Sequence, residues 1–183
     1  MMKNPIARLI IVLALISIGS GLFLALTYTY TIPHIEANAA HDQEVAILET
    51  LPDAVSFEEL KNTEFPIYVG LDSSGNEVGF AYVAEGGGFQ GMIGLMVGVD
   101  PEQEIITGVK ILSHSETPGL GARITEAVFL DQFAQKSISD NFIVKEDIDG
   151  VTGATFSSKS VSAILEQTLP KAVEQYRESG GGK

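Results

Sequence analysis

The sequence predicts an α+β protein in which one N-terminal transmembrane helix precedes one domain with a twisted antiparallel sheet flanked by helices. Three observations predict this architecture. The N-terminus is a long apolar run, the middle of the chain holds strand-like segments joined by short turns, and helical patterns follow towards the C-terminus. The chain has 183 residues, so the part outside the apolar run is long enough for one domain with its own core.

The apolar run extends from Leu9 to about Tyr28 and predicts a single membrane span. About 20 residues, each rising 1.5 Å, cross the hydrocarbon core of a bilayer. Lys3 and Arg8 lie on the short N-terminal side, which favours a cytoplasmic N-terminus and a domain on the extracytoplasmic, periplasmic side of the inner membrane. A cleaved signal peptide is the alternative, with Ala37-Asn38-Ala39 as its cleavage site, but this site lies well beyond the apolar run.

The chain therefore divides into four parts. Residues 1–30 form a short cytoplasmic N-terminus and the transmembrane helix, and residues 31–63 form a helical stalk that leads into the domain. Within the stalk, Pro33 to Leu51 is expected to be helical, whereas Pro52 to Thr63 reads as a loop with room for a short helical piece. The domain covers residues 64–178, and residues 179–183 are expected to be a disordered tail.

Two pairs of strand-like segments open the domain. Phe65–Leu71 and Val78–Ala84 flank a turn rich in Asp, Ser, Gly and Asn, which predicts a hairpin. Met92–Val99 and Ile105–Ser113 flank a second turn. Antiparallel pairing of consecutive strands is the simplest sheet that these segments can form.

Helical patterns occupy the rest of the domain. Residues 124–137 fit an amphipathic helix. A second pattern follows Ser157 and Ser158, which are cap-forming residues, and its apolar positions recur at helical spacing: Val161, Ile164, Leu165, Leu169 and Val173. Pro170 either kinks this helix or begins a second short one.

Composition excludes several functions. Cysteine is absent, which rules out thiolate ligation of iron–sulfur clusters, disulfides and thiol catalysis. The three histidines are scattered, which argues against a dedicated zinc site. The formal net charge is −13, and nucleic acid is therefore not expected as a partner, because phosphate backbones are bound by clusters of Lys and Arg.

The segment Asp149-Gly150-Val151-Thr152-Gly153-Ala154-Thr155 carries the strongest chemical signal. It places a threonine hydroxyl just after a glycine turn, where a helix begins, and the free N–H groups of a helix N-terminus suit a phosphate. An ordinary turn before a helix is the alternative. A nucleotide-binding P-loop over Gly153–Ser160 is disfavoured, because Ser158 stands where that motif needs its second glycine.

A second loop, Ser113 to Arg123, follows the last predicted strand. Its core, Glu116-Thr117-Pro118-Gly119-Leu120-Gly121, has the glycines and proline of a tight loop whose N–H groups can face a ligand. Taken alone, it is equally typical of a plain strand-to-helix connection.

Together the two motifs resemble the RnfG and NqrC family of FMN-binding subunits, and more closely its RnfG branch. The resemblance includes Gly88-Phe89-Gln90-Gly91 and the single N-terminal anchor, and it extends from about Leu9 to Leu169. It implies that Thr155 carries FMN through a phosphoester bond. It also implies that this subunit relays electrons in a membrane complex that couples electron transfer between ferredoxin and NAD to ion transport, without a complete active site of its own.

The resemblance assigns roles to further residues. A flavin transferase of the ApbE type would read Asp149, Thr152, Gly153 and Ala154, which also shape the turn. Glu116, Thr117, Leu120 and Gly121 would line the flavin, and Ser158 and Lys159 would neighbour its phosphate. The other Rnf subunits and the membrane are the implied partners.

Two other functions fit the same residues. One is a membrane-anchored binding or scaffold module without a redox cofactor, and the other is the flavin carrier of a different extracytoplasmic reductase. The chain has no tryptophan to stack on a flavin ring, and Phe89, Tyr82 and Phe156 are the aromatic alternatives.

Overall fold

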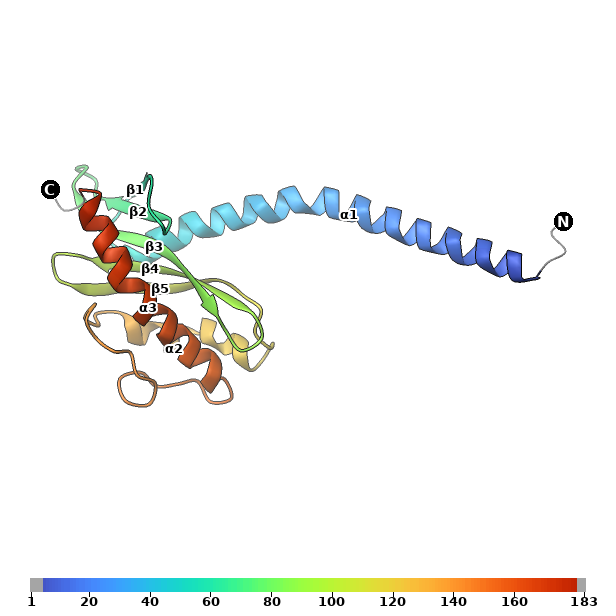
Figure 1. The fold of residues 1–183 in the computed structure, drawn as a ribbon. Coiled ribbons are helices and arrows are strands. Elements are labelled where there is room, and N and C mark those ends of the chain that lie inside the picture. The colour runs from blue at the N-terminus through green and yellow to red at the C-terminus, as the bar shows by residue number, and fades with distance from the viewer. Residues whose placement is uncertain (1–4, 181–183) are drawn as a thin grey trace. The chain divides into compact units, whose positions relative to one another are not determined.

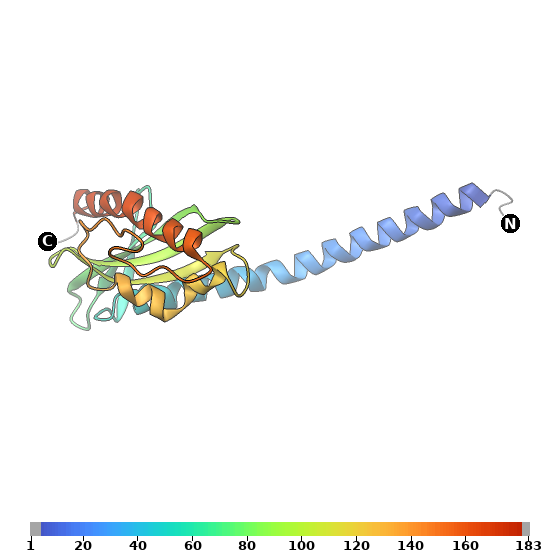
Figure 2. The ribbon, with the colours of Figure 1, turned by 90° about the horizontal axis from the view of Figure 1, so that it is seen from below.

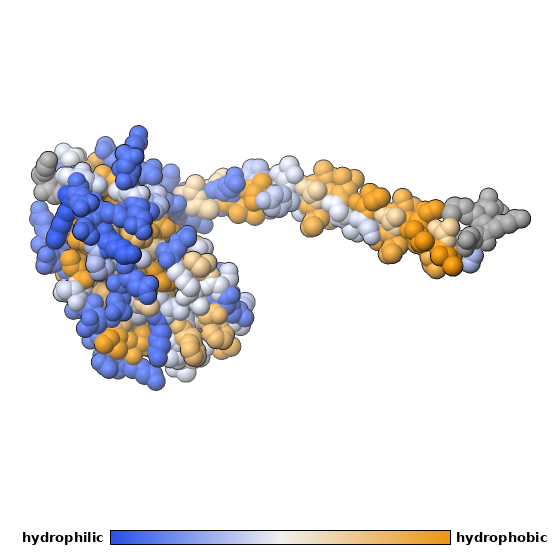
Figure 3. Space-filling view, viewed as in Figure 1, coloured by the Kyte–Doolittle hydropathy of each residue, from blue (hydrophilic) through white to orange (hydrophobic). Residues whose placement is uncertain are grey.

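The structure is a computed structural model and describes residues 5–180. The chain forms two compact units, Met1–His41 and Asp42–Lys183. Helix α1 (Pro5–Thr50) contains all described residues of the first unit, and its last residues belong to the second (Figure 1). It contains a stretch long and apolar enough to cross a membrane, and apolar side chains cover this part of it (Figure 3). The predicted span Leu9–Tyr28 lies within α1, and Pro33 does not end the helix.

The second unit is built on a five-stranded sheet in which sequential strands are neighbours, in the order β1-β2-β3-β4-β5 (Figure 1). The strands are β1 (Ser56–Leu60), β2 (Ile67–Leu71), β3 (Glu77–Gly87), β4 (Met92–Asp100) and β5 (Ile105–His114). All four pairings are antiparallel. The predicted antiparallel sheet and both predicted strand pairs are thus confirmed.

Strand β1 corrects the prediction of a loop between Pro52 and Thr63. Its sequence, Ser-Phe-Glu-Glu-Leu, lies at the sheet edge, where most of its side chains are exposed. Charged residues on an edge strand discourage pairing with other chains, and they also remove the apolar alternation by which a strand is recognised.

Alternating residues of the sheet build two cores. In β3, Phe80, Tyr82 and Ala84 belong to the larger core, together with α3 (Thr155–Glu178), whereas Ala81 belongs to a smaller core on the other face. The last turns of α1 close the smaller core through Ala46 and Ile47. Figure 2 shows α3 lying along one side of the sheet. Both faces of the sheet therefore carry buried side chains, because successive residues of a strand point to opposite faces.

The helix predicted over residues 124–137 is replaced by three short elements. These are the 3₁₀ turn η1 (Gly121–Thr125), helix α2 (Ala127–Leu130) and the 3₁₀ turn η2 (Asp131–Phe133). Glu126 adopts an extended backbone conformation, which interrupts the helical path between η1 and α2. Ile124, Phe129 and Phe133 are still buried, but Val128 is 83% exposed.

Helix α3 is continuous and contains Pro170, so the chain does not start a second helix there. It begins at Thr155 with Ala154 as its N-cap residue, which corrects the prediction that Ser157 and Ser158 cap it. Both serines lie in the first turn, and their hydroxyls serve other bonds described below. Ser179 and Gly180 form the turn that ends α3, and the rest of the predicted disordered tail lies outside the described residues.

Candidate functional site

A shallow hollow of about 160 Å³ lies where three segments meet: the β3–β4 loop, the loop after β5, and the start of α3. Glycine and apolar side chains form most of its lining. The complete set is Phe89, Glu116, Thr117, Leu120, Gly121, Gly153, Ala154, Thr155, Phe156 and Ser157. Pockets that enclose a drug-sized ligand measure roughly 300–1,000 Å³, so this hollow can cover only part of such a molecule.

Thr155 is the first residue of α3 and lines the hollow. Its side chain is partly exposed, and no residue between positions 5 and 180 forms a hydrogen bond with its hydroxyl. The turn before it depends on Gly153, whose φ of +85° is strained for other residues. A helix usually begins with a capping side chain, and here the N-cap is an alanine. The hydroxyl and the first helical N–H groups are thus left open to a ligand.

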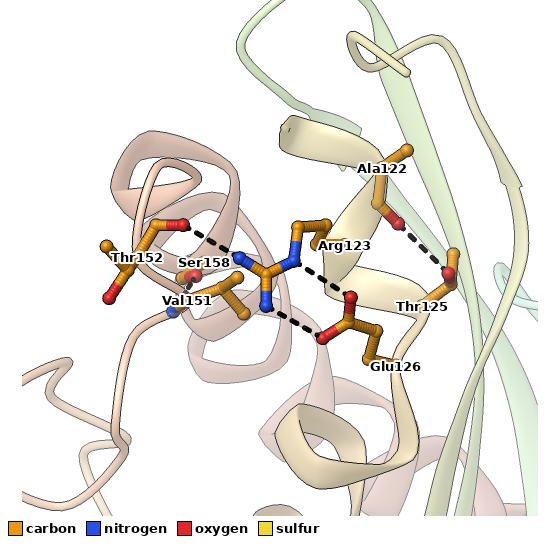
Figure 4. A network of polar contacts seen from close by, with 7 residues as sticks. All are labelled: Ala122, Arg123, Thr125, Glu126, Val151, Thr152 and Ser158. Atoms are coloured by element: carbon orange, nitrogen blue, oxygen red, sulfur yellow. Dashed lines mark hydrogen bonds and ion pairs between the residues drawn. The ribbon is translucent and has the colours of Figure 1, made fainter. Parts of the chain in front are cut away.

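Side chains from outside the motif hold the turn in place (Figure 4). The Arg123 guanidinium donates to the Thr152 carbonyl oxygen at 3.1 Å, and the Ser158 hydroxyl accepts a hydrogen bond from the Val151 N–H at 3.0 Å. Gln132 clamps the main chain of Asp149: its amide oxygen accepts from the Asp149 N–H at 2.7 Å, and its amide nitrogen donates to the Asp149 carbonyl at 3.2 Å. The backbone of the motif is therefore fixed at three points, while the side chain of Asp149 stays exposed.

The orientation of Arg123 is set by Glu126. Two of its nitrogens donate to the two Glu126 carboxylate oxygens at 2.8 and 3.1 Å. This pair of hydrogen bonds lowers the pKa of Glu126 and raises the pKa of Arg123. A two-point contact between a guanidinium and a carboxylate fixes the plane of the guanidinium, which directs its third nitrogen, Nη1, at the Thr152 carbonyl.

Glu116 joins the loop of β3–β4 to the start of α3. One of its carboxylate oxygens accepts from the N–H groups of Phe89 and Gln90 at 2.8 and 3.1 Å, and the other accepts from the Ser157 hydroxyl at 2.5 Å. The residue is buried. Burial by itself raises the pKa of Glu116, but the hydrogen bonds from Ser157 and the backbone outweigh it, so the pKa lies below its usual value. Glu116 is therefore a charged acceptor whose two oxygens both bind protein donors.

The structure gathers most of the predicted site residues. Seven of them line the hollow: Glu116, Thr117, Leu120, Gly121, Gly153, Ala154 and Thr155. The other four lie outside its lining, since Thr152 and Asp149 are exposed on the turn, Lys159 is exposed on α3, and Ser158 is buried.

Three residues make contacts at the site that were not predicted, although Ser157 was predicted as a cap of α3. They are Arg123, Gln132 and Ser157, and their contacts join residues 29, 17 and 41 positions apart. Only Arg123 has a local signal, because it closes the second motif. Among the aromatic alternatives, Tyr82 is fully buried and bonds Thr168, so it cannot reach a ligand in the hollow.

Three larger hollows lie elsewhere among the described residues of the second unit. Two of them, of about 250 and 220 Å³, lie where the end of α1 meets β5. The third, of about 460 Å³, lies at the turns around Gly75 and Pro101. None of the three contains a residue of the two motifs. The lining of the third includes Glu77, Asp100 and Glu102, whose charge opposes an anionic ligand.

Comparisons with known proteins agree on a family. The sequence model of the FMN-binding domain family matches residues 88–170, a range that includes the hollow and Thr155. The chain is 39% identical over 177 residues to the G subunit of the ion-translocating oxidoreductase complex of Methanosarcina acetivorans, a match that covers 91% of this chain and 94% of that protein.

Other relatives carry similar names. The G subunit of the proton-translocating ferredoxin:NAD(+) oxidoreductase complex of Clostridium ljungdahlii is 30% identical, with 90% of this chain and 88% of that protein covered. Among solved structures, NqrC of Shewanella oneidensis superposes with a TM-score of 0.53 at 22% identity and covers 71% of each chain, which shows a shared fold.

Proposed function

Because the chain belongs to the RnfG and NqrC family of FMN-binding subunits, we propose that it is an electron-relay subunit of the RnfG type. In this proposal it works in a membrane-bound, ion-translocating ferredoxin:NAD oxidoreductase complex and carries FMN as a phosphoester on Thr155. Its electron-transfer role rests on the relatives named above. The covalent site rests on one observation of this chain: the Thr155 hydroxyl is unbonded by any described residue and opens on the hollow of the FMN-binding segment.

The residues around Thr155 fit a phosphate ester. The N–H groups of Thr155, Phe156 and Ser157 have no acceptor within residues 5–180, and they carry the partial positive charge of a helix N-terminus. Phosphate oxygens are suitable acceptors for these donors. Lys159, exposed on the following turn, supplies a positive charge near the same end of α3.

Attachment requires a phosphoryl transfer to Thr155. The phosphoanhydride bond of a flavin dinucleotide breaks, the phosphorus of its FMN half bonds to the Thr155 oxygen, and the nucleoside monophosphate leaves. The hydroxyl proton passes to a base of the transferase. A flavin transferase of the ApbE type catalyses this step, and the exposed Asp149 and Thr152 side chains are the parts of the motif that it can reach.

The protein residues then keep the cofactor at the surface of the domain. Bound FMN supplies the electron-transfer chemistry, because side chains alone cannot carry it. Thr155 tethers the group, Gly153 gives the turn its conformation, and Glu116 holds the two loops that border the hollow. A hollow of about 160 Å³ would cover only part of a flavin ring, so electron-transfer partners would have access to the rest.

The partners and location follow the same proposal. The remaining subunits of the complex are the partners, α1 anchors the subunit by a single span, and the domain lies on the extracytoplasmic side with the N-terminus in the cytoplasm. The positions of Lys3 and Arg8 support this orientation, because both lie in the short segment before the span.

Intact mass and in-gel flavin fluorescence test the covalent site. The full chain is produced in membranes with an active flavin transferase, beside Thr155→Val and Thr155→Ser. We expect added mass equal to FMN less one water, with fluorescence that survives denaturation, in the parent and in Thr155→Ser. Thr155→Val keeps the shape of threonine without its hydroxyl and is expected to lack both. A peptide map with the added mass on Thr152, or an unmodified parent beside an active transferase, contradicts the proposal.

A further inference from the structure

Two phenylalanine rings lie exposed at the hollow. Phe89 is 64% exposed and Phe156 is 71% exposed, yet their ring centroids lie only 5.6 Å apart with an angle of 33° between the planes. They come from different segments, the β3–β4 loop and the first turn of α3. Single exposed apolar side chains are common on protein surfaces, but a pair that meets across two segments beside a hollow indicates a binding surface.

Glu116 joins the two backbone segments that carry the rings. Its carboxylate bonds the Phe89 N–H on one side and the hydroxyl of Ser157, the neighbour of Phe156, on the other. The Gly88 N–H also donates to the Gly91 carbonyl at 2.6 Å, which closes the loop that carries Phe89. The backbones that carry the two rings are therefore held next to each other, although the rings themselves are largely exposed.

Resting on the proposed function, we propose that Phe89 and Phe156 form the seat of the isoalloxazine ring of FMN bound to Thr155. Phe156 follows Thr155 directly, so the attachment point and one ring of the pair share the first turn of α3. The ribityl chain gives the flavin ring reach across the hollow from its tethered phosphate. A planar aromatic ligand packs on phenyl rings in offset or tilted arrangements, and it removes their exposed faces from water.

The remaining lining supports a flat, weakly polar ligand at this place. Leu120, which is 53% exposed, borders the same hollow, and Gly121 and Gly153 present backbone without side chains. Two of the polar side chains in the lining, Glu116 and Ser157, bond each other. A peptide of a partner protein is the competing occupant, but it would not explain why the pair stands next to an unbonded threonine hydroxyl.

Tryptophan scanning tests this seat. The natural chain has no tryptophan, so Phe156→Trp, Phe89→Trp and the control Val128→Trp each introduce a single indole. Val128 is 83% exposed on α2 and does not line the hollow. Indole quenches flavin fluorescence by electron transfer at contact, and all three positions are exposed enough to accept the larger ring. The full chains are flavinylated in membranes, and flavin emission is compared at equal flavin loading by intact mass.

We expect both Phe→Trp variants to emit several-fold less flavin fluorescence than the parent and Val128→Trp. Equal emission from all four loaded proteins overturns the seat while leaving the covalent site intact. An unloaded parent instead overturns the proposed function, so the two failures are distinguishable. If Phe156→Trp prevents loading because the transferase no longer accepts the turn, Phe89→Trp decides, since it lies on the other segment.

Discussion

Replacing Glu116 separates the two segments that border the hollow. The Glu116→Ala change removes the acceptor of two backbone N–H groups and of the Ser157 hydroxyl. A hydrogen bond to a charged group contributes about 1.5–3 kcal/mol to stability, and a buried donor left without a partner costs about 1–3 kcal/mol. The N–H groups of Phe89 and Gln90 lie on a surface loop and can turn to water, whereas Ser157 is 2% exposed and cannot.

These values predict that Glu116→Ala lowers the free energy of unfolding by about 3 kcal/mol, with about half of the loss from the stranded Ser157 hydroxyl. For a domain of this size, this corresponds to a fall in melting temperature of roughly 6–12 °C. Glu116→Gln keeps an acceptor for the loop but loses the charge, so we expect a loss of only about 1 kcal/mol.

The assay is equilibrium denaturation of the full chain in detergent micelles, monitored by circular dichroism, with Glu166→Ala as the control. Glu166 is an exposed residue of α3, and its replacement is expected to change the stability by less than about 0.5 kcal/mol. A Glu116→Ala protein as stable as the control would refute the reasoning, because it would mean that the carboxylate does not join the two segments.

Three further predictions follow from the same contacts. Because the folded-state pKa of Glu116 is lowered, its contribution to stability is complete above the unfolded-state pKa and is lost as the pH falls through the folded-state pKa. When the free energy of unfolding is measured at decreasing pH, it should therefore fall less steeply in Glu116→Gln than in the parent. Arg123→Gln removes the hydrogen bond to the Thr152 carbonyl, which helps to hold the turn in the conformation that the transferase modifies. If this conformation loses about 1 kcal/mol of stabilisation, the initial rate of flavinylation should fall about five-fold. Arg177→Gln breaks an exposed ion pair elsewhere on α3 and should leave that rate unchanged. Tyr82→Phe removes a buried hydrogen bond to Thr168, whose hydroxyl still donates to Ile164, so chemical denaturation should report a loss of only about 1 kcal/mol.

Local patterns predicted the parts of the fold that local chemistry determines. Apolar alternation and turn residues marked β2 to β5, and a long apolar run marked the span in α1. Strand β1 escaped prediction because it is an exposed edge whose pairing with β2 is a tertiary contact. The helix predicted over residues 124–137 failed because its apolar spacing cannot report the extended backbone at Glu126.

The site shows the same division between local and distant information. The sequence identified the motif residues that line the hollow, since glycine turns and a helix start are local features. It could not identify what Glu116 does, because its partners lie 26, 27 and 41 residues away. Nor could it show that Ser157 and Ser158 bond other segments, since a serine near a helix start is the usual sign of a cap.

The proposed covalent attachment of FMN would place two demands on the turn before α3. A transferase would first have to reach the hydroxyl of Thr155 in the folded domain, and the same turn would afterwards have to hold the attached group in one place. A deep pocket would meet only the second demand, since it would close the hydroxyl off. The shallow hollow leaves Thr155 partly exposed, while hydrogen bonds from Arg123, Gln132 and Ser158 fix the backbone of the turn. The fixed backbone gives rigidity and the partly exposed hydroxyl gives access, so both demands can be met without a conformational change in the domain.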